Sequence, residues 1–363
     1  MKKKFLLFVQ GEGRGHMTQA MTLHDLLLEK GHEVSGIVLG SSGKRDIPEF
    51  FFQHVKVPIH QLQSPNFVTD KKNKSINVPK SVIHGFRNLK TYRESLRKID
   101  ALIKETKPDV IVNFFDLLAG LYYQLYKPNI PHLCIAHQYI YLHPEFKFPD
   151  GKKGDQFAIK LFTKITSTGS NKKLALSFYE LQGTKNKVTV VPPLLRNHVF
   201  ELNPETNGHY LIYLVNNGYF EEIAEWHNKN QEVELHCFTD NPQFIHANYS
   251  FNKNTLHVHA INDKLFLEKM SGARGLATSA GFESVCEAMY LGKPVLMVPI
   301  KGHYEQFCNS RDAHKAGAGI YADRFELSKL IEHTKQYNYE NPLFKSWISD
   351  AKERIYKEIE SFS

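Results

Sequence analysis

The chain has 363 residues, of which 42% are hydrophobic and 23% charged, so it is long enough for two domains and ordinary for a globular protein. Its formal charge of +8 fits an acidic partner such as a nucleotide or an anionic membrane face, or lysines spread over a solvated surface. The four cysteines are far apart and no apolar run reaches 18 residues, which argues against disulfides, a cysteine-based zinc site and a membrane span, and favours the cytoplasm.

The first predicted element is a buried parallel strand over 2–10, which leads into a glycine-rich turn over 11–16. Apolar residues then recur at helical spacing over 17–28, and Gly31 marks the end of that helix. A second strand over 32–40 completes a strand–helix–strand unit. This order predicts the start of a doubly wound α/β domain.

The glycine-rich turn does not have the spacing of a dinucleotide site. Its pattern is G-x-G-x-G, whereas NAD-binding turns have G-x-G-x-x-G. The second strand ends as Leu39-Gly40-Ser41-Ser42, without an acidic residue to hold a ribose. A histidine at the start of the helix, His16, is not needed there for hydride transfer. The sequence therefore disfavours an NAD site.

The first half continues with alternating strands and helices. After a mixed region over 44–78, a basic amphipathic helix is predicted over 80–106. Its apolar side either packs on the core or forms a surface for anionic lipid or a lipid-linked acceptor. Strands over 107–116 and 130–138 follow, separated by a helix over 117–126.

Polar side chains end these two strands. Asn113 and Asp116 lie at the end of one strand, and His137 and Gln138 lie at the end of the next. Because ligands gather outside the carboxyl ends of strands in open α/β sheets, we expect these residues to share a crevice with His16. For His137 a structural hydrogen bond and an acceptor-site role stay open.

The second half repeats the same alternation after a run rich in asparagine, proline and glycine. Strands are expected over 209–218, 233–240 and 255–262, and helices from 219, over 263–273 and over 327–336. The predicted organisation is an N-terminal domain over 1–196, a linker over 197–208, a C-terminal domain over 209–341 and a C-terminal helix over 342–363 that packs on the first domain.

The stretch over 277–318 contains the clearest chemical pattern. An apolar run turns through Ser279-Ala280-Gly281 into an amphipathic helix, and a buried strand over 295–300 then ends in a polar loop. A glycine turn that opens a helix leaves backbone N–H groups unpaired at the positive end of the helix dipole. This arrangement suits a phosphate or diphosphate.

Three blocks resemble the two-domain GT-B glycosyltransferases, close to the lipid-II-forming N-acetylglucosaminyltransferases and the wider UDP-glycosyltransferase superfamily. The blocks are the turn over 11–16, the segment 255–273 with its loop from His259 to Asp263, and 279–294 with Val298-Pro299 and Glu305-Gln306-x-x-Asn309. They occur in family order and span nearly the whole chain. The resemblance implies two Rossmann-like doubly wound domains that face a central cleft, of which the N-terminal one binds the acceptor and the C-terminal one binds the nucleotide sugar.

The resemblance also implies how the donor is bound. The turn at Gly281 would hold the diphosphate, Glu287 the ribose, Glu305 and Gln306 the sugar hydroxyls, and the backbone of Ile261 the base. The implied donor contacts are Gly15, Asn217, Ile261, Ser279, Gly281, Phe282, Glu283, Ser284, Glu287, Glu305 and Gln306.

His16 occupies the position of the catalytic base in the plant-type enzymes that the chain resembles. Asn113 stands where those enzymes have the aspartate that pairs with the histidine, so Asp116 is the nearer carboxylate candidate. Ser279 stands where many superfamily members have a phosphate-binding histidine, which shifts phosphate contacts to the backbone or Arg14. His137 and Gln138 are the candidate acceptor contacts.

We therefore expect a hexosyltransferase that moves a sugar from a nucleotide sugar, a UDP-sugar, to a hydroxyl acceptor, including a lipid-linked one. The resemblance implies inversion, and the absence of a D-x-D pair favours metal-independent transfer. No cofactor besides the co-substrate, no metal and no nucleic acid is expected, and the site of action is the cytoplasm or the inner face of the membrane. The alternatives are a nucleotide-sugar 2-epimerase with the same fold and a non-catalytic nucleotide-sugar-binding protein.

Overall fold

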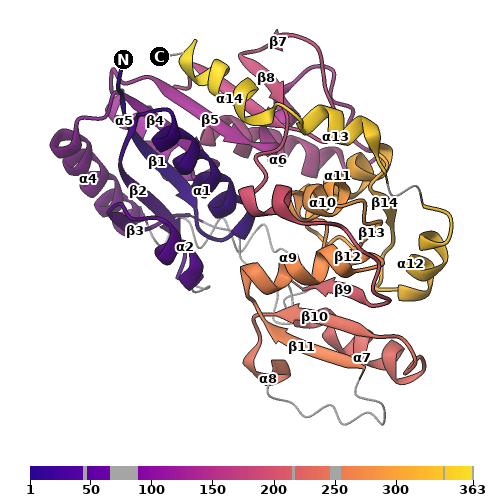
Figure 1. The fold of residues 1–363 in the computed structure, drawn as a ribbon. Helices are drawn as coiled ribbons and strands as arrows, with labels where there is room; N and C mark the ends of the chain where they lie inside the picture. Colours follow the sequence, from indigo (N-terminus) through magenta and orange to yellow (C-terminus); the bar gives the residue numbers. More distant parts are fainter. Residues whose placement is uncertain (44–46, 66–88, 215–216, 246–254, 338–339, 362–363) are drawn as a thin grey trace. The chain divides into compact units, whose positions relative to one another are not determined.

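The computed structural model describes residues 1–43, 47–65, 89–214, 217–245, 255–337 and 340–361. These residues divide into two compact units: the first takes the described part of 1–196 together with 347–361, and the second takes 197–346. Each unit has its own parallel sheet with flanking helices (Figure 1). Among these residues, no helix combines the length and apolar character that a membrane crossing requires.

The sheet of the first unit has the strand order β3-β2-β1-β4-β5-β6-β8-β7. Its strands are parallel apart from the antiparallel β7–β8 pair. The elements are β1 (Lys4–Gln10), α1 (Arg14–Glu29), β2 (Glu33–Ser41), α2 (Glu49–His54), β3 (Ile59–Gln63), α4 (Leu89–Thr106), β4 (Val110–Phe114), α5 (Leu117–Tyr126), β5 (His132–Ala136), the 3₁₀ helix η1 (His137–Leu142), α6 (Lys153–Thr166), β6 (Lys172–Leu176), β7 (Thr184–Lys185) and β8 (Val188–Val191).

The central strands are mostly apolar, as expected for strands that helices cover on both faces. Alternate residues of β1 point to opposite faces, so Leu6 and Phe8 join one cluster with Leu96 and Ile99 of α4 and Leu118 of α5. All these side chains are almost completely removed from solvent. The predicted helix over 80–106 thus packs on the core through α4, while 80–88 lie outside the described residues.

The second unit repeats the pattern with the strand order β11-β10-β9-β12-β13-β14, and all its strand pairs are parallel. Two doubly wound parallel sheets confirm the predicted fold class. The elements are η2 (Asn197–Glu201), β9 (Tyr210–Tyr213), η3 (Asn217–Tyr219), α7 (Phe220–Asn228), β10 (Leu235–Thr239), α8 (Pro242–Ile245), β11 (Leu256–Ala260), α9 (Asp263–Gly272), β12 (Leu276–Thr278), α10 (Phe282–Tyr290), β13 (Val295–Met297), α11 (Tyr304–Lys315), β14 (Gly319–Tyr321) and α12 (Leu327–Thr334).

The C-terminal segment differs from the single helix predicted over 342–363. It forms two helices, α13 (Pro342–Ile348) and α14 (Ala351–Glu360). The break falls at Asp350, which starts α14 and accepts a hydrogen bond from Nε of Arg354 at 2.7 Å. Asp350 makes no side-chain hydrogen bond to the first turn of α14, so the interruption fits the low helix propensity of aspartate rather than a cap.

The last residues return to the first unit. Nε1 of Trp347 donates to the carbonyl of Ser177 at 2.9 Å, and Lys30 pairs with Glu353 at 2.7 Å. Trp347 is almost completely buried. These contacts make 347–361 part of the first unit, so the second unit is an insertion within it.

Candidate active site

In each unit, candidate residues lie after the two strands at which the order of the sheet reverses, and the others follow neighbouring strands. The reversal lies between β1 and β4 in the first unit and between β9 and β12 in the second. Ligands of doubly wound folds bind outside the carboxyl ends of such strands. His16 and Asp116 follow β1 and β4, while the turn at Gly281 follows β12 and Asn217 begins η3 after β9.

His16 lies in the first turn of α1 and is only 7% exposed. Its ring stacks on that of Phe115, with a centroid distance of 5.9 Å. The side-chain nitrogen of Gln138 lies 3.4 Å from His16 Nε2. Burial lowers the pKa of His16 to about 4, against a smaller raising effect from Gln19. The imidazole is therefore neutral near pH 7.

The structure places Asp116 and Asn113 in a hydrogen-bonded cap rather than against His16. Asp116 Oδ1 accepts from the backbone N–H of Leu118 at 2.7 Å and thereby caps α5. Asn113 Oδ1 accepts from the backbone N–H of Asp116, and its amide donates to the carbonyls of Asp116 and Thr166. Neither side chain hydrogen-bonds His16, so a His16–Asp116 pair stays a prediction.

The Asp116 carboxyl group fits against Gly40 at the end of β2. A Cβ atom at Gly40 would lie 1.8 Å from Asp116 Oδ2, so no larger residue fits there without displacing the carboxyl. Burial raises the pKa of Asp116 to about 7, although the N–H of Leu118 and the hydroxyl of Ser64 act in the opposite direction. The position of the Asp116 carboxyl therefore requires glycine at position 40, which could not be predicted from the sequence pattern.

His137 and Gln138, the candidate acceptor contacts, begin η1 and are both buried. The ring nitrogen Nδ1 of His137 lies 2.7 Å from the carbonyl of Leu176, and the ring packs edge-to-face on Phe178. His137 therefore has the contacts of a structural histidine. Of the two residues, Gln138 is the one that reaches His16.

Two residues at these turns have left-handed backbone conformations that glycine would adopt more easily. Phe115, directly after β4, has φ 61°, and Ala280, between β12 and α10, has φ 62°. Strained residues of this kind persist where the surrounding structure fixes them, and they cluster at functional sites. Asn309 of α11 donates to the carbonyl of Ala280 at 3.3 Å and so helps to fix that turn.

The N-terminus of α10 has no side-chain cap. Its N-cap residue is Gly281, whereas α9 and α11 of the same unit are capped by Asn262 and His303. A Cβ atom at Gly281 would meet nothing within 4 Å except Ser284 Oγ at 3.8 Å. The hydroxyl of Ser279 is buried and makes no hydrogen bond. The start of α10 thus combines the positive end of the helix dipole with open space at Gly281, which is the setting of an anion site.

The predicted donor residues of α10 and α11 are mostly buried. Glu287 is 2% exposed, which is unusual for a carboxylate. Gln306 accepts from the backbone N–H of Ile300 at 2.9 Å through its side-chain oxygen, and Glu305 beside it is partly exposed. Phe282, Glu283 and Ser284 lie in the first turn of α10 and are buried.

Ile261 lies between β11 and α9 and is partly exposed, next to the capping residue Asn262. Asn217 starts η3, and its side chain is outside the described part of the structure. Gly15 lies in the first turn of α1 beside His16. Asn309 ends the Glu305-Gln306-x-x-Asn309 pattern, and its hydrogen bond to Ala280 is a role that the sequence did not predict.

Two doubly wound units with a glycine turn at the second switch point are the architecture of the GT-B fold, and the comparisons with known proteins identify the class as a glycosyltransferase. A model of Glycosyl transferase family 1 matches residues 3–338, so the chain belongs to this family. An uncharacterized glycosyltransferase of Methanosarcina mazei is 25% identical over 340 residues, which cover 87% of this chain and 84% of the relative.

A second relative has a more specific name. The UDP-N-acetylglucosamine--N-acetylmuramyl-(pentapeptide) pyrophosphoryl-undecaprenol N-acetylglucosamine transferase of Fusobacterium nucleatum is 23% identical over 345 residues, covering 91% of this chain and 88% of the relative. Among solved structures, UGT89C1 of Arabidopsis thaliana complexed with quercetin matches with a TM-score of 0.66 and 14% identity, over 99% of this chain and 98% of that one. At that identity the likeness shows the fold alone.

Proposed function

We propose that this glycosyltransferase uses a UDP-sugar and transfers its sugar, with inversion, to a hydroxyl acceptor. The observation that carries the proposal is the N-terminus of α10, which has no side-chain cap and has open space at Gly281, on the helix that also bears the buried Glu287. The name of the relative from Fusobacterium nucleatum supports UDP as the nucleotide.

In this proposal the second unit binds the donor. The diphosphate accepts from the backbone N–H groups at Gly281 and from the unpartnered hydroxyl of Ser279. Glu287 accepts from the ribose hydroxyls. Because the oxygen of Gln306 already accepts from Ile300, a sugar hydroxyl meets its amide nitrogen and the Glu305 carboxylate. Ile261 meets the base through its backbone.

His16 is the proposed general base. A neutral imidazole can take the acceptor proton near pH 7, and the contact of Gln138 with Nε2 favours the tautomer that carries its proton on Nδ1. The N–H groups of the α10 terminus meet the negative charge that develops on the leaving diphosphate. Together these groups supply the transfer chemistry without a metal ion.

The acceptor side of the proposal includes a peripheral contact with an anionic membrane. Three apolar side chains on one side of α6 are solvent-exposed: Phe157 (69%), Leu161 (46%) and Ile165 (36%). Lys160 and Lys164 lie on the same helix. An exposed apolar stripe between lysines is typical of a helix that binds the interface of anionic lipids, which suits a lipid-linked acceptor.

Donor binding and transfer can be tested separately. We expect UDP-sugars to raise the melting temperature of the purified protein more than TDP-sugars, and UDP to be released when an acceptor is present. His16→Ala should lower kcat by about 100-fold to 10,000-fold, while UDP binds as in the wild type. Nucleotide binding without transfer in any acceptor screen would support the sensor alternative, and conversion of the donor sugar without acceptor would support the epimerase.

The membrane contact is tested by co-sedimentation with vesicles that contain phosphatidylglycerol. Phe157→Ser should reduce binding to these vesicles several-fold. The matched control is Leu125→Ser on α5, since Leu125 is also exposed, at 63%, but lies outside the stripe. Equal effects of both substitutions would contradict the assignment to α6.

A further inference from the structure

Histidines gather on one face of the second unit's sheet, at its β11 edge. In the parallel register His236 of β10 pairs directly with His257 of β11. His257 and His259 are two residues apart on the same strand, so both project from the same face. The ring of His236 stacks on both, with centroid distances of 4.6 Å to His257 and 5.1 Å to His259.

Glu234 adds a carboxylate to this group. Its Oε1 atom lies 3.0 Å from His236 Nε2 and 3.7 Å from His257 Nε2, and the three atoms all lie within 4.8 Å of one another. In a tetrahedral zinc site, with bonds of about 2.0–2.1 Å, ligand atoms are about 3.4 Å apart. The three atoms thus need small adjustments to share one ion.

A metal site must also be open to an ion that enters from solvent. Glu234 and His257 are partly exposed, which gives an ion access from solvent.

His236 also has the support that metal-binding histidines require. Ligating imidazoles almost always bond through their second nitrogen to a neighbour that fixes the ring. Here His236 Nδ1 lies 2.8 Å from Nε2 of His259, which leaves Nε2 of His236 directed at Glu234. The His209 ring packs edge-to-face on His236 and limits its rotation further.

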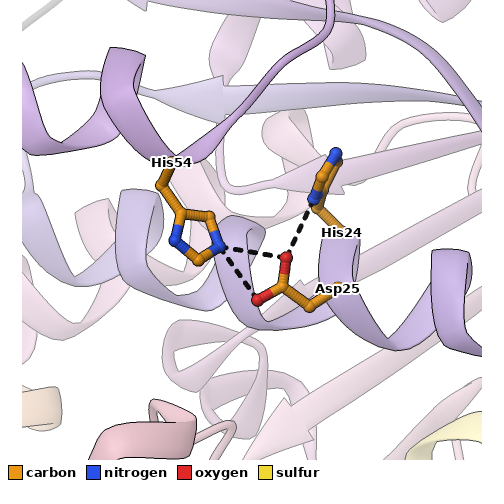
Figure 2. Close-up of side chains that lie close together, drawn as sticks. All are labelled: His24, Asp25 and His54. Atoms are coloured by element: carbon orange, nitrogen blue, oxygen red, sulfur yellow. Dashed lines mark hydrogen bonds and ion pairs between the residues drawn. The ribbon is translucent and has the colours of Figure 1, made fainter.

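A second cluster, in the first unit, lacks this support. Figure 2 shows Asp25 between His24 of α1 and His54 of α2, with nitrogen–oxygen distances of 2.9–3.1 Å. His54 contacts both carboxylate oxygens of Asp25. The Nε2 atom of His24 is buried without a partner. The contacts are those of a His–Asp–His hydrogen-bonded group.

We propose that Glu234, His236 and His257 form a site for a divalent transition metal, with Zn²⁺ as the expected ion and His259 as the residue that orients His236. Two imidazoles and one carboxylate are the donor types that Zn²⁺ prefers, and they leave a fourth position for water. The ion would join edge strand β11 to β10, and it takes no part in the transfer chemistry proposed above.

The test uses untagged, chelator-treated protein and Zn²⁺ titrated by calorimetry, with the melting temperature as a second readout. We expect one saturable site that raises the melting temperature. Glu234→Gln and His257→Ala should each weaken Zn²⁺ binding at least tenfold. His54→Ala is the matched control, because it removes an exposed histidine from the other cluster and should leave the affinity unchanged.

Glu234→Gln changes a partly exposed side chain, so it provides a folded variant even if His257→Ala does not fold. A tetrahedral Co²⁺ absorption spectrum in the wild type, lost in Glu234→Gln, would support the assignment independently. No saturable binding, or affinity that falls in His54→Ala but not in Glu234→Gln, would overturn it. Neither readout depends on sugar transfer, so failure of this site leaves the proposed function untouched.

Discussion

The side-chain nitrogen of Gln138 lies 3.4 Å from Nε2 of His16, although the two residues are 122 positions apart in the chain. The contact joins the end of β5 to the start of α1 within the first unit. A donor at this position makes Nε2 of His16 an acceptor and keeps the proton on Nδ1. Gln138 is thus a positioning residue for the proposed base.

Gln138→Leu tests this role. We expect kcat to fall by about tenfold, less than the loss of about 100-fold or more expected for His16→Ala, because the base remains but its tautomer is no longer selected. Gln156→Leu on α6 is the control. A Gln138→Leu variant with unchanged kcat and a changed acceptor KM would instead make Gln138 a substrate contact.

The pH profile of kcat/KM tests the state of His16. A base must be deprotonated, and burial lowers the pKa of His16 to about 4, so activity should be lost only as the pH falls towards that value. We expect the acidic side of the profile to be flat between about pH 5.5 and pH 7.5. A loss centred near pH 6.5 would mean that His16 is solvated in the active state.

Asp116→Asn separates the capping role of Asp116 from pairing with His16. Asparagine keeps the cap of α5, so we expect kcat to change by no more than about threefold. A much larger loss would favour the pairing.

The same variant should change how stability depends on pH. Burial raises the pKa of Asp116 to about 7, above its unfolded value, so the stability that the protonated form contributes is lost as the pH rises through 7. At pH 8 the asparagine variant should therefore unfold at a higher urea concentration than the wild type. Equal midpoints at pH 8 would contradict the raised pKa.

Gly281→Ala tests the phosphate site. The added methyl group has space in the protein but would stand where the diphosphate approaches, so UDP should bind about tenfold more weakly. The free energy of unfolding should fall by no more than about 1 kcal/mol. The control, Gly154→Ala in the exposed start of α6, should leave UDP binding unchanged. If Gly281→Ala bound UDP as tightly as the wild type, the proposal that the diphosphate binds at this turn would be wrong.

Gly40→Ala tests the fit of Asp116 against β2. Because the new Cβ would lie 1.8 Å from Asp116 Oδ2, we expect a loss of about 3 kcal/mol in the free energy of unfolding, measured by urea titration. Asp116→Ser keeps a capping oxygen on a shorter side chain and should recover part of the loss in the double variant. Additive effects of the two substitutions would show that the residues do not compete for this space.

Much of the fold could be predicted because its signals are local. The apolar strands, the glycine stops and the helix over 117–126 depend on patterns within about ten residues, and α5 has the predicted bounds. The break at Asp350 was missed because the apolar periodicity of the segment continues across it. Short edge strands such as β14 have too few residues to show a period.

The candidate site was less predictable because its details depend on contacts between distant segments. The glycine turn at Gly281 could be predicted, since a strand, a glycine and a helix are consecutive. The competition between Gly40 and Asp116 and the approach of Gln138 to His16 could not, because topology sets them. Asn113 and Asp116 were expected at the right edge of the sheet, but their hydrogen bonds serve the cap of α5.

The insertion of the second unit within the first has a consequence for synthesis. The carbonyl of Ser177 accepts a hydrogen bond from Trp347, and Lys30 forms an ion pair with Glu353. A nascent chain that has reached residue 196 therefore holds an unfinished first unit while the ribosome makes the whole of the second. The unit that begins to fold first is therefore the last to be completed. Until α14 has been made, the surface that it covers in the finished unit stays exposed to solvent.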